Sequence, residues 1–257
     1  MQITPTVKQL LIINIIFFIG SQIVGDAAYD FLSLYFFENP KFQIWQPLTH
    51  MFMHAEVYRG NVGNIMHIAF NMFALYSFGS VLEHFWGGKR FLFFYISCGL
   101  GAVILHSLIS CYLFHDGLET LIQAGYHKAN ILNLLNQGKI DPSWTTILGE
   151  SRMYNFASSY IAPVVGASGA IYGLLVAFAF MAPNAELALM FIPVPIKAKY
   201  FVPGLLCVDL FLGVKGSSIF GAGGTGIAHF AHIGGAIVGF LMMWYWKKNS
   251  FNQNRWN

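Results

Sequence analysis

Two polar residues in apolar surroundings suggest a reaction: Ser168, at the start of one apolar run, and His232, inside another. A strongly polar side chain in a membrane span is costly unless it is paired or faces water, so such residues are functional candidates. A serine hydroxyl becomes a strong nucleophile when a histidine next to it takes its proton. The pair therefore predicts nucleophilic catalysis, provided that the fold brings the two side chains together.

Ser168 lies in the sequence Gly166-Ala167-Ser168-Gly169. This motif alone is weak, because small residues in membrane helices usually serve helix packing. The apolar run that follows ends at Pro183 and spans only about 24 Å as a helix, less than the hydrocarbon thickness of about 30 Å. We therefore expect Ser168 just below the outer membrane surface. Its N–H, in the first turn of a helix, would be free to stabilise an oxyanion.

Small residues predict how Ser168 and His232 could meet. They repeat every four residues on both runs, as Gly169, Gly173 and Ala177 and as Ala231, Gly235 and Gly239. Facing stripes of this kind let two helix backbones approach closely. Tyr172 lies one turn after Ser168 on the same face, where we expect it to stack against the His232 ring and orient it.

His67 and Asn71 share one face of another apolar run, because they are four residues apart. Taken alone, they would be a polar pair that satisfies itself between helices. Beside a reactive serine, two side-chain donors on one face match an oxyanion hole.

The remaining candidate groups predict no further chemistry. His50, His54 and His229 lack a His-Glu-x-x-His spacing, so neither a metal nor another cofactor is expected. Asp209 is interpreted as an outer-end residue with a local partner rather than as a third catalytic residue. The three cysteines (Cys98, Cys111 and Cys207) show no disulfide or zinc pattern. The net charge of +3 forms no basic run, so nucleic acid is not an expected partner.

Composition indicates that the chain lies in a membrane. Of its 257 residues, 56% are hydrophobic and 10% are charged, whereas a soluble domain carries about 25% charged residues. We expect one all-α membrane domain over residues 1–257, without internal repeats. Its six predicted transmembrane helices cover residues 10–28, 64–85, 91–113, 165–182, 200–214 and 227–246.

Two connections are distinctive. Residues 29–63 are rich in aromatic side chains and contain Pro40 and Pro47, so we expect this first loop to lie partly in the outer interface. Residues 114–164 form a long polar third loop outside the cytoplasm, with an amphipathic helix expected over 118–135.

The distribution of positive charge predicts the orientation. If both termini are inside, the inner set is Lys8, Lys89, Arg90, Lys197, Lys199, Lys247, Lys248 and Arg255, and the outer set is Lys41, Arg59 and Lys215. Both termini are then cytoplasmic and the polar residues face the outside. No transit-peptide or cleavable-signal character is apparent, so a bacterial cytoplasmic membrane is expected.

Over about residues 45–246 the sequence resembles the rhomboid family of intramembrane serine proteases. The matching stretches are 49–54, His67 to Asn71, 166–169 with Tyr172, and Ala231-His232 followed by Gly235 and Gly239, in that order. The resemblance implies a bundle of six transmembrane helices and a serine endopeptidase that cleaves membrane-protein substrates near the outer face. It implies a Ser168–His232 dyad without a carboxylate, an oxyanion hole of His67, Asn71 and the Ser168 N–H, and no cofactor. Tyr172, Gly166, Gly169 and Gly235 would support this site.

The resemblance also implies a mobile cap over residues 213–226, which contain six glycines (213, 216, 221, 223, 224 and 226). Three departures from the family pattern stand out. Gln46 replaces a frequent arginine, which removes one expected anchor of the first loop. The gap between His54 and His67 is longer than usual, and Phe230 stands where some relatives have glycine.

Two other functions fit parts of the sequence. A catalytically silent relative would bind membrane clients without cutting them, but such proteins typically lack the serine or the histidine. A proton-coupled transporter would show repeats and a site at mid-depth, whereas here the polar residues gather near one face. The substrate, the oligomeric state and the role of the long loop do not follow from the sequence.

Overall fold

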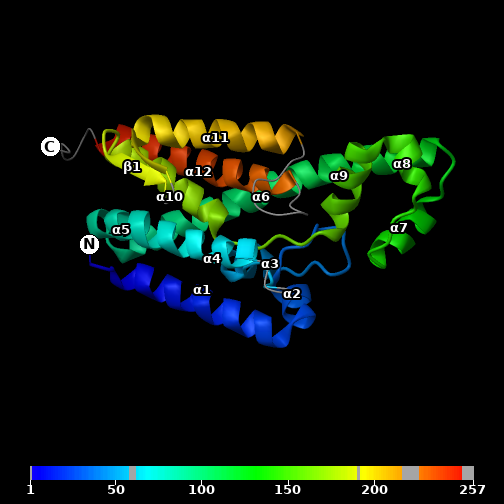
Figure 1. The fold of residues 1–257 in the computed structure, drawn as a ribbon, viewed down its shortest axis with the longest axis horizontal. Helices are drawn as coiled ribbons and strands as arrows, with labels where there is room; N and C mark the ends of the chain where they lie inside the picture. The colour runs from blue at the N-terminus through cyan, green and yellow to red at the C-terminus, as the bar shows by residue number, and fades with distance from the viewer. Residues whose placement is uncertain (1, 58–61, 190–191, 216–225, 251–257) are drawn as a thin grey trace.

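Helices make up most of the computed structural model, which describes residues 2–57, 62–189, 192–215 and 226–250. Each of the six apolar segments predicted to cross the membrane is helical. They correspond to α1 (Pro5–Val24), α4 (Val62–Ala74) continued through the π-helical turn η3 (Leu75–Gly79) into α5 (Ser80–Trp86), α6 (Gly88–Gln123), α10 (Ser168–Met181), α11 (Ala198–Lys215) and α12 (Ile227–Ser250). The start of α1 and the end of α12 lie at the same end of the bundle (Figure 1).

Not all of these helices have the length and composition of a complete span. Within the described residues, four do: Pro5–Val24, Asn64–Trp86, Gly88–Gln123 and Ile227–Lys248. Helix α10 is apolar but has only 14 residues, about 21 Å at 1.5 Å per residue. Helix α11 contains Pro203 in its interior and carries Lys199, Asp209 and Lys215. Helices α10 and α11, which carry Ser168 and Asp209, are thus less typical of membrane spans than α12, which carries His232.

The outward-facing side chains of α1 show what surrounds the bundle. Ile16, Ile19 and Ile23 are 53–80% exposed, whereas Asn14 on the same helix is fully buried. An aqueous surface would reverse this pattern, so these faces contact lipid. Together with the other apolar helices, this identifies an integral membrane protein. The helix starts and ends earlier than the predicted 10–28, because Gly25 at φ +70° terminates it.

Helices α10 and α12 approach each other along their glycines. A Cβ atom added to Gly235 would overlap the carbonyl oxygen of Gly169, and one added to Gly239 would lie 2.8 Å from the Cα of Gly173. The small-residue stripes found in the sequence therefore do form the contact between these two helices. No larger side chain fits where the backbones meet.

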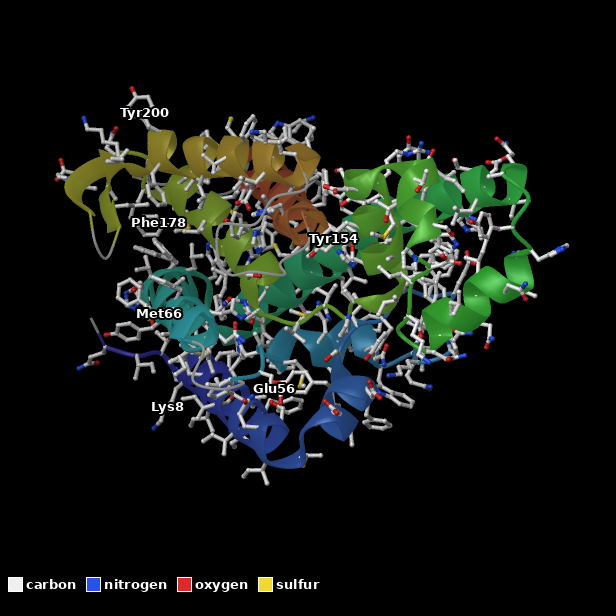
Figure 2. The ribbon with its side chains drawn as sticks, turned by 45° about the vertical axis from the view of Figure 1, so that its right-hand side comes forward. Lys8, Glu56, Met66, Tyr154, Phe178 and Tyr200 are labelled. Carbon is white, nitrogen blue, oxygen red and sulfur yellow. The ribbon has the colours of Figure 1, made fainter. Side chains whose placement is uncertain are left out.

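A third helix, α6, completes this contact. A Cβ on Gly101 of α6 would lie 3.0 Å from the carbonyl oxygen of Gly234 of α12, and the Cys98 and Ala102 side chains would meet Cβ atoms added to Gly173 and Gly169. On its other side α10 packs against the α4–α5 segment, where Phe178 (labelled in Figure 2) contacts Phe78 edge-on, with the ring centroids 5.0 Å apart. Tyr200 of α11 points away from the bundle (Figure 2) and is 65% exposed.

The first loop, which follows the C-terminal end of α1, contains α2 (Asp26–Leu32), α3 (Gln46–Thr49) and the 3-10 turn η1 (His50–Phe52). The expectation that it lacks an anchor at Gln46 is wrong. Gln46 is fully buried, its amide donates to the carbonyls of Lys41 (2.9 Å) and Asp30 (3.3 Å), and its oxygen accepts from the N–H of Tyr35 (3.2 Å). The neutral amide thus holds three points of the loop backbone.

The long third loop is a helical lobe rather than an irregular connection. Helix α6 has 36 residues, about 54 Å in length, and extends well past the bundle. Its last turns pack with α7 (Lys128–Asn136), α8 (Ser143–Leu148) and α9 (Glu150–Ile161) around a core that includes Phe114, Trp144 and Phe156. The lobe lies at the end opposite the termini (Figure 1).

The predicted single helix over residues 118–135 is wrong. Its first part belongs to α6, which ends at Gln123, and Gly125 at φ +97° turns the chain before α7 begins. A positive φ is readily adopted only by glycine, so this residue separates the two helices.

A small antiparallel hairpin, β1 (Glu186–Leu189) and β2 (Ile192–Lys197), connects α10 to α11. The prediction of an all-α protein missed it. Strand β2 contains two prolines, Pro193 and Pro195, which an edge strand tolerates because it leaves some N–H positions unpaired.

We expect Gly235→Ala to destabilise the protein, because the added methyl group would overlap the backbone of α10 and force the two helices apart. Overpacking of this kind costs about 1–3 kcal/mol. The measurement is the thermal unfolding temperature in detergent. Gly20→Ala in α1 is the matched control, since a Cβ there meets nothing within 4 Å. An unchanged unfolding temperature for Gly235→Ala would contradict the packing described.

Candidate active site

Ser168 and His232 meet where α10 and α12 begin. Ser168 is the first residue of α10, and His232 lies in the second turn of α12. The Ser168 Oγ and the His232 Nε2 are 2.9 Å apart, a hydrogen-bond distance. The chain turns into α10 at Gly166, whose φ of +126° strongly favours glycine. The glycine contact between the two helices holds both side chains at the same depth.

Tyr172 lies one turn after Ser168 and covers one face of the imidazole. The Tyr172 and His232 rings are 4.2 Å apart at their centroids and only 10° from parallel. The arrangement fixes the plane of the imidazole, as the spacing of the sequence predicted.

A carboxylate completes the surroundings of His232. The His232 Nδ1 lies 3.0 Å from the Asp209 Oδ1. The same carboxylate is hydrogen-bonded by the Tyr172 hydroxyl and by the His229 Nδ1. The expectation of a histidine without a carboxylate therefore differs from the structure, as does the view of Asp209 as a residue apart from the site. The signal available in the sequence was a lone carboxylate in an apolar helix, which needs a partner in lipid.

The oxygen partner on Nδ1 determines what Nε2 can do. A carboxylate accepts hydrogen bonds, so the His232 Nδ1 carries the proton when it contacts Asp209. The neutral ring then presents a lone pair at Nε2, toward the Ser168 hydroxyl. This is the tautomer in which histidine can act as a base.

His67 of α4 lies beside the turn that precedes Ser168. A Cβ on Gly166 would be 3.3 Å from the His67 Nε2 and 3.6 Å from the Ser168 Oγ, so imidazole and hydroxyl border the same small space. The Nδ1 of His67 is buried and has no hydrogen-bond partner among the residues that the structure describes.

Asn71 is buried one turn further along α4, but its amide does not point to the serine. Its Nδ2 donates to the carbonyl of His67 in its own helix (2.7 Å), and its Oδ1 is buried without a partner in the described part of the chain. The amide would have to rotate to donate to an oxyanion.

The two histidines of the first loop, His50 and His54, contact residues that neighbour Ser168 in the fold. The carbonyl of His50 accepts a hydrogen bond from the N–H of Gly166 (2.9 Å). His54 is hydrogen-bonded to Asn14 of α1 (2.9 Å) and packs edge-on against His67. Burial lowers the pKa of His50 to about 4, and burial and the neighbouring His67 lower that of His54 to about 3, so both stay neutral near pH 7. His54 thus has a place in the structure despite its long separation from His67 in sequence.

Two further features noted in the sequence are Phe230, where some relatives have glycine, and the predicted cap. Phe230 packs against the end of α11, since a Cβ on Gly213 would lie 3.1 Å from its ring. Most of the glycine-rich segment predicted to be a cap, residues 216–225, lies outside the described residues.

Within the described part of the chain, two groups of side chains have donor atoms close enough to share a metal ion: Asp209 with His229 and His232, and Glu38 with Cys111 and His115. In the first group, direct hydrogen bonds to the carboxylate already account for the close approach. In the second, the His115 Nε2 lies 2.7 Å from the Glu38 Oε1 at an exposed position. Neither arrangement requires a metal ion.

Comparison with known proteins agrees with this architecture. The family model described as Rhomboid domain matches residues 41–249, most of the chain. The chain is also similar to a yeast protein named Rhomboid protein 1, mitochondrial (Saccharomyces cerevisiae, strain ATCC 204508 / S288c), with 26% identity over 187 residues. That match covers 71% of this chain and 38% of the yeast protein. From the extent of the family match, the chain belongs to the rhomboid family.

Proposed function

We propose that this protein is an intramembrane serine endopeptidase that cleaves transmembrane segments of other membrane proteins. The observation that carries the proposal is the hydrogen bond between the Ser168 Oγ and the His232 Nε2, 2.9 Å long, at the ends of two membrane helices. A hydroxyl paired with an oriented imidazole is an activated nucleophile. Membership of the rhomboid family supports the same activity.

The proposed reaction uses these two residues twice. The Ser168 Oγ attacks the scissile carbonyl while His232 takes its proton, and His232 then gives that proton to the leaving amine as the C–N bond breaks. Water enters next and attacks the acyl-enzyme while His232 takes its proton. His232 then gives that proton to the Ser168 Oγ as the acyl C–O bond breaks, which releases the carboxylic acid and restores the serine.

A negatively charged oxygen forms in each half-reaction. It is stabilised best by hydrogen-bond donors that the protein already holds in place. The N–H of Ser168 is available because it belongs to the first turn of α10. His67 borders the same space, and Asn71 would join after rotation of its amide. Donors fixed in this way act mainly on the transition state.

The proposed substrates are single-pass or polytopic membrane proteins. A helical peptide bond is shielded by its own hydrogen bonds, so a substrate helix must unwind near the site. The side chain of His232 is 21% exposed, which is compatible with access of the water that hydrolysis consumes.

We also propose an orientation from the distribution of positive charge. The starts of α1 and α6, the junction of β2 with α11, and the end of α12 lie at the same end of the bundle (Figure 1). The sequence of these segments contains Lys8, Lys89, Arg90, Lys197, Lys199, Lys247 and Lys248. The site and the helical lobe lie toward the other end. By the positive-inside rule the termini are cytoplasmic and the site opens to the outside, as in a bacterial plasma membrane.

Cleavage of a transmembrane reporter in proteoliposomes tests the proposal. The reporter carries a helix-breaking residue near one end of its span, and we expect the wild type to cut it there. Ser168→Ala should abolish cleavage and leave the thermal unfolding temperature unchanged, because only the nucleophilic oxygen is removed. Capture of reporters without any cleavage would instead support a client-binding protein, and cleavage by Ser168→Ala would show that another nucleophile acts.

Asn71→Ala tests the oxyanion hole. We expect kcat to fall by about 100-fold with KM nearly unchanged, because an oxyanion donor acts mainly in the transition state. Asn64→Ala near the start of the same helix is the control, since Asn64 bonds only to the backbone of the preceding loop among the described residues. A wild-type kcat for Asn71→Ala would exclude Asn71 from this role.

A further inference from the structure

The His232 ring contacts a buried carboxylate, Asp209, in addition to Ser168. A serine–histidine dyad does not require this carboxylate. Asp209 is 3% exposed in α11, a helix with an otherwise mainly apolar sequence. Its two oxygens accept hydrogen bonds from three side chains of two other helices: Tyr172 of α10, and His229 and His232 of α12. A buried carboxylate is tolerated when it is hydrogen-bonded in this way.

We infer that Asp209 is a positioning residue for catalysis, which orients His232 of the proposed Ser168–His232 dyad. The inference rests on the proposed function, because the step that Asp209 serves is proton transfer between Ser168 and His232. Asp209 does not touch the substrate. It acts through His232, by holding the proton on Nδ1 and leaving Nε2 free.

The argument depends on the two tautomers of a neutral imidazole. Tyr172 fixes the plane of the ring by stacking, but a stacked ring can still carry its proton on either nitrogen. With the proton on Nε2, both the ring and the serine would present a donor, and the ring could not accept the hydroxyl proton. The carboxylate 3.0 Å from Nδ1 excludes this state. It also stabilises the imidazolium that forms when the proton is transferred.

His229 and Tyr172 keep Asp209 in place. The His229 Nδ1 shares the Oδ1 oxygen with His232, and the Tyr172 hydroxyl occupies Oδ2. The Tyr172 ring and the carboxylate therefore form one unit that contacts the imidazole from its face and from its edge. The position of α11, which carries only Asp209 into this unit, becomes coupled to the reactivity of Ser168.

The test combines kinetics with nitrogen NMR of protein labelled with ¹⁵N-histidine, in detergent. The signals of His232 are identified among those of the nine histidines by their loss in His232→Gln. In the wild type we expect His232 to carry its proton on Nδ1. In Asp209→Asn the amide can donate to Nδ1, so the proton should move to Nε2. The expected kinetic result is a fall in kcat on the order of 100- to 10,000-fold with KM little changed, the size of effect seen when a triad carboxylate is replaced by its amide.

Two further variants separate positioning from general structural support. Asp209→Glu retains a carboxylate, so it should keep the proton on Nδ1 and recover part of kcat. Asp116→Asn is the matched control, because Asp116 is an exposed carboxylate in the lobe, paired with Arg152, and it should match the wild type in both measurements. A purely structural role for Asp209 would lower the unfolding temperature without changing the tautomer.

The inference is overturned if wild-type His232 carries its proton on Nε2, or if Asp209→Asn keeps the wild-type tautomer and kcat. The first result needs no variant, so it decides the matter even if Asp209→Asn does not fold. A wild type that cleaves no reporter would overturn the proposed function, while the tautomer measurement would still show whether Asp209 orients His232.

Discussion

The contact between α10 and α12 has almost no room for side chains. Glycine faces backbone at Gly169, Gly235 and Gly239, and α6 contributes Gly101 to the same junction. Lipid provides no hydrophobic force that would drive helices together, so packing of this closeness is what associates them. Ser168 and His232 lie at one end of this contact. Because the two backbones are so close there, the two side chains can form a hydrogen bond.

Polar groups at this depth impose a second constraint, because each of them needs a partner. The carboxylate of Asp209 takes three donors, and Asn14 and His54 pair with each other between α1 and the first loop. Eight buried side-chain polar atoms of the described residues have no hydrogen-bond partner, and two of these atoms belong to His67 and Asn71, the residues proposed for the oxyanion hole.

Much of this arrangement could be predicted from the sequence, because its signals are local. Apolar runs predicted the helices, and the four-residue spacing of small residues predicted which two of them meet. The same spacing placed Tyr172 against His232. The contact of α6 with α10 and α12 was not predicted. Its small residues lie in a long apolar run, which was interpreted only as a membrane span.

Contacts between distant segments could not be predicted in this way. Asp209 and His232 are 23 residues apart on different helices, and no periodic pattern connects them. Gln46 holds the first loop through backbone carbonyls, which have no signature in sequence. The helical lobe was read as a loop because its helices are short and become stable only by packing on the extension of α6.

The most direct measurement of the central claim is the reactivity of Ser168 itself. The folded protein is treated with a small fluorophosphonate, which reacts only with activated serines, and intact mass and peptide mapping locate the adduct. The account predicts a single adduct on Ser168 in the wild type and a loss of labelling in His232→Ala. Equal labelling of the wild type and His232→Ala, or an adduct on a different residue, would contradict it.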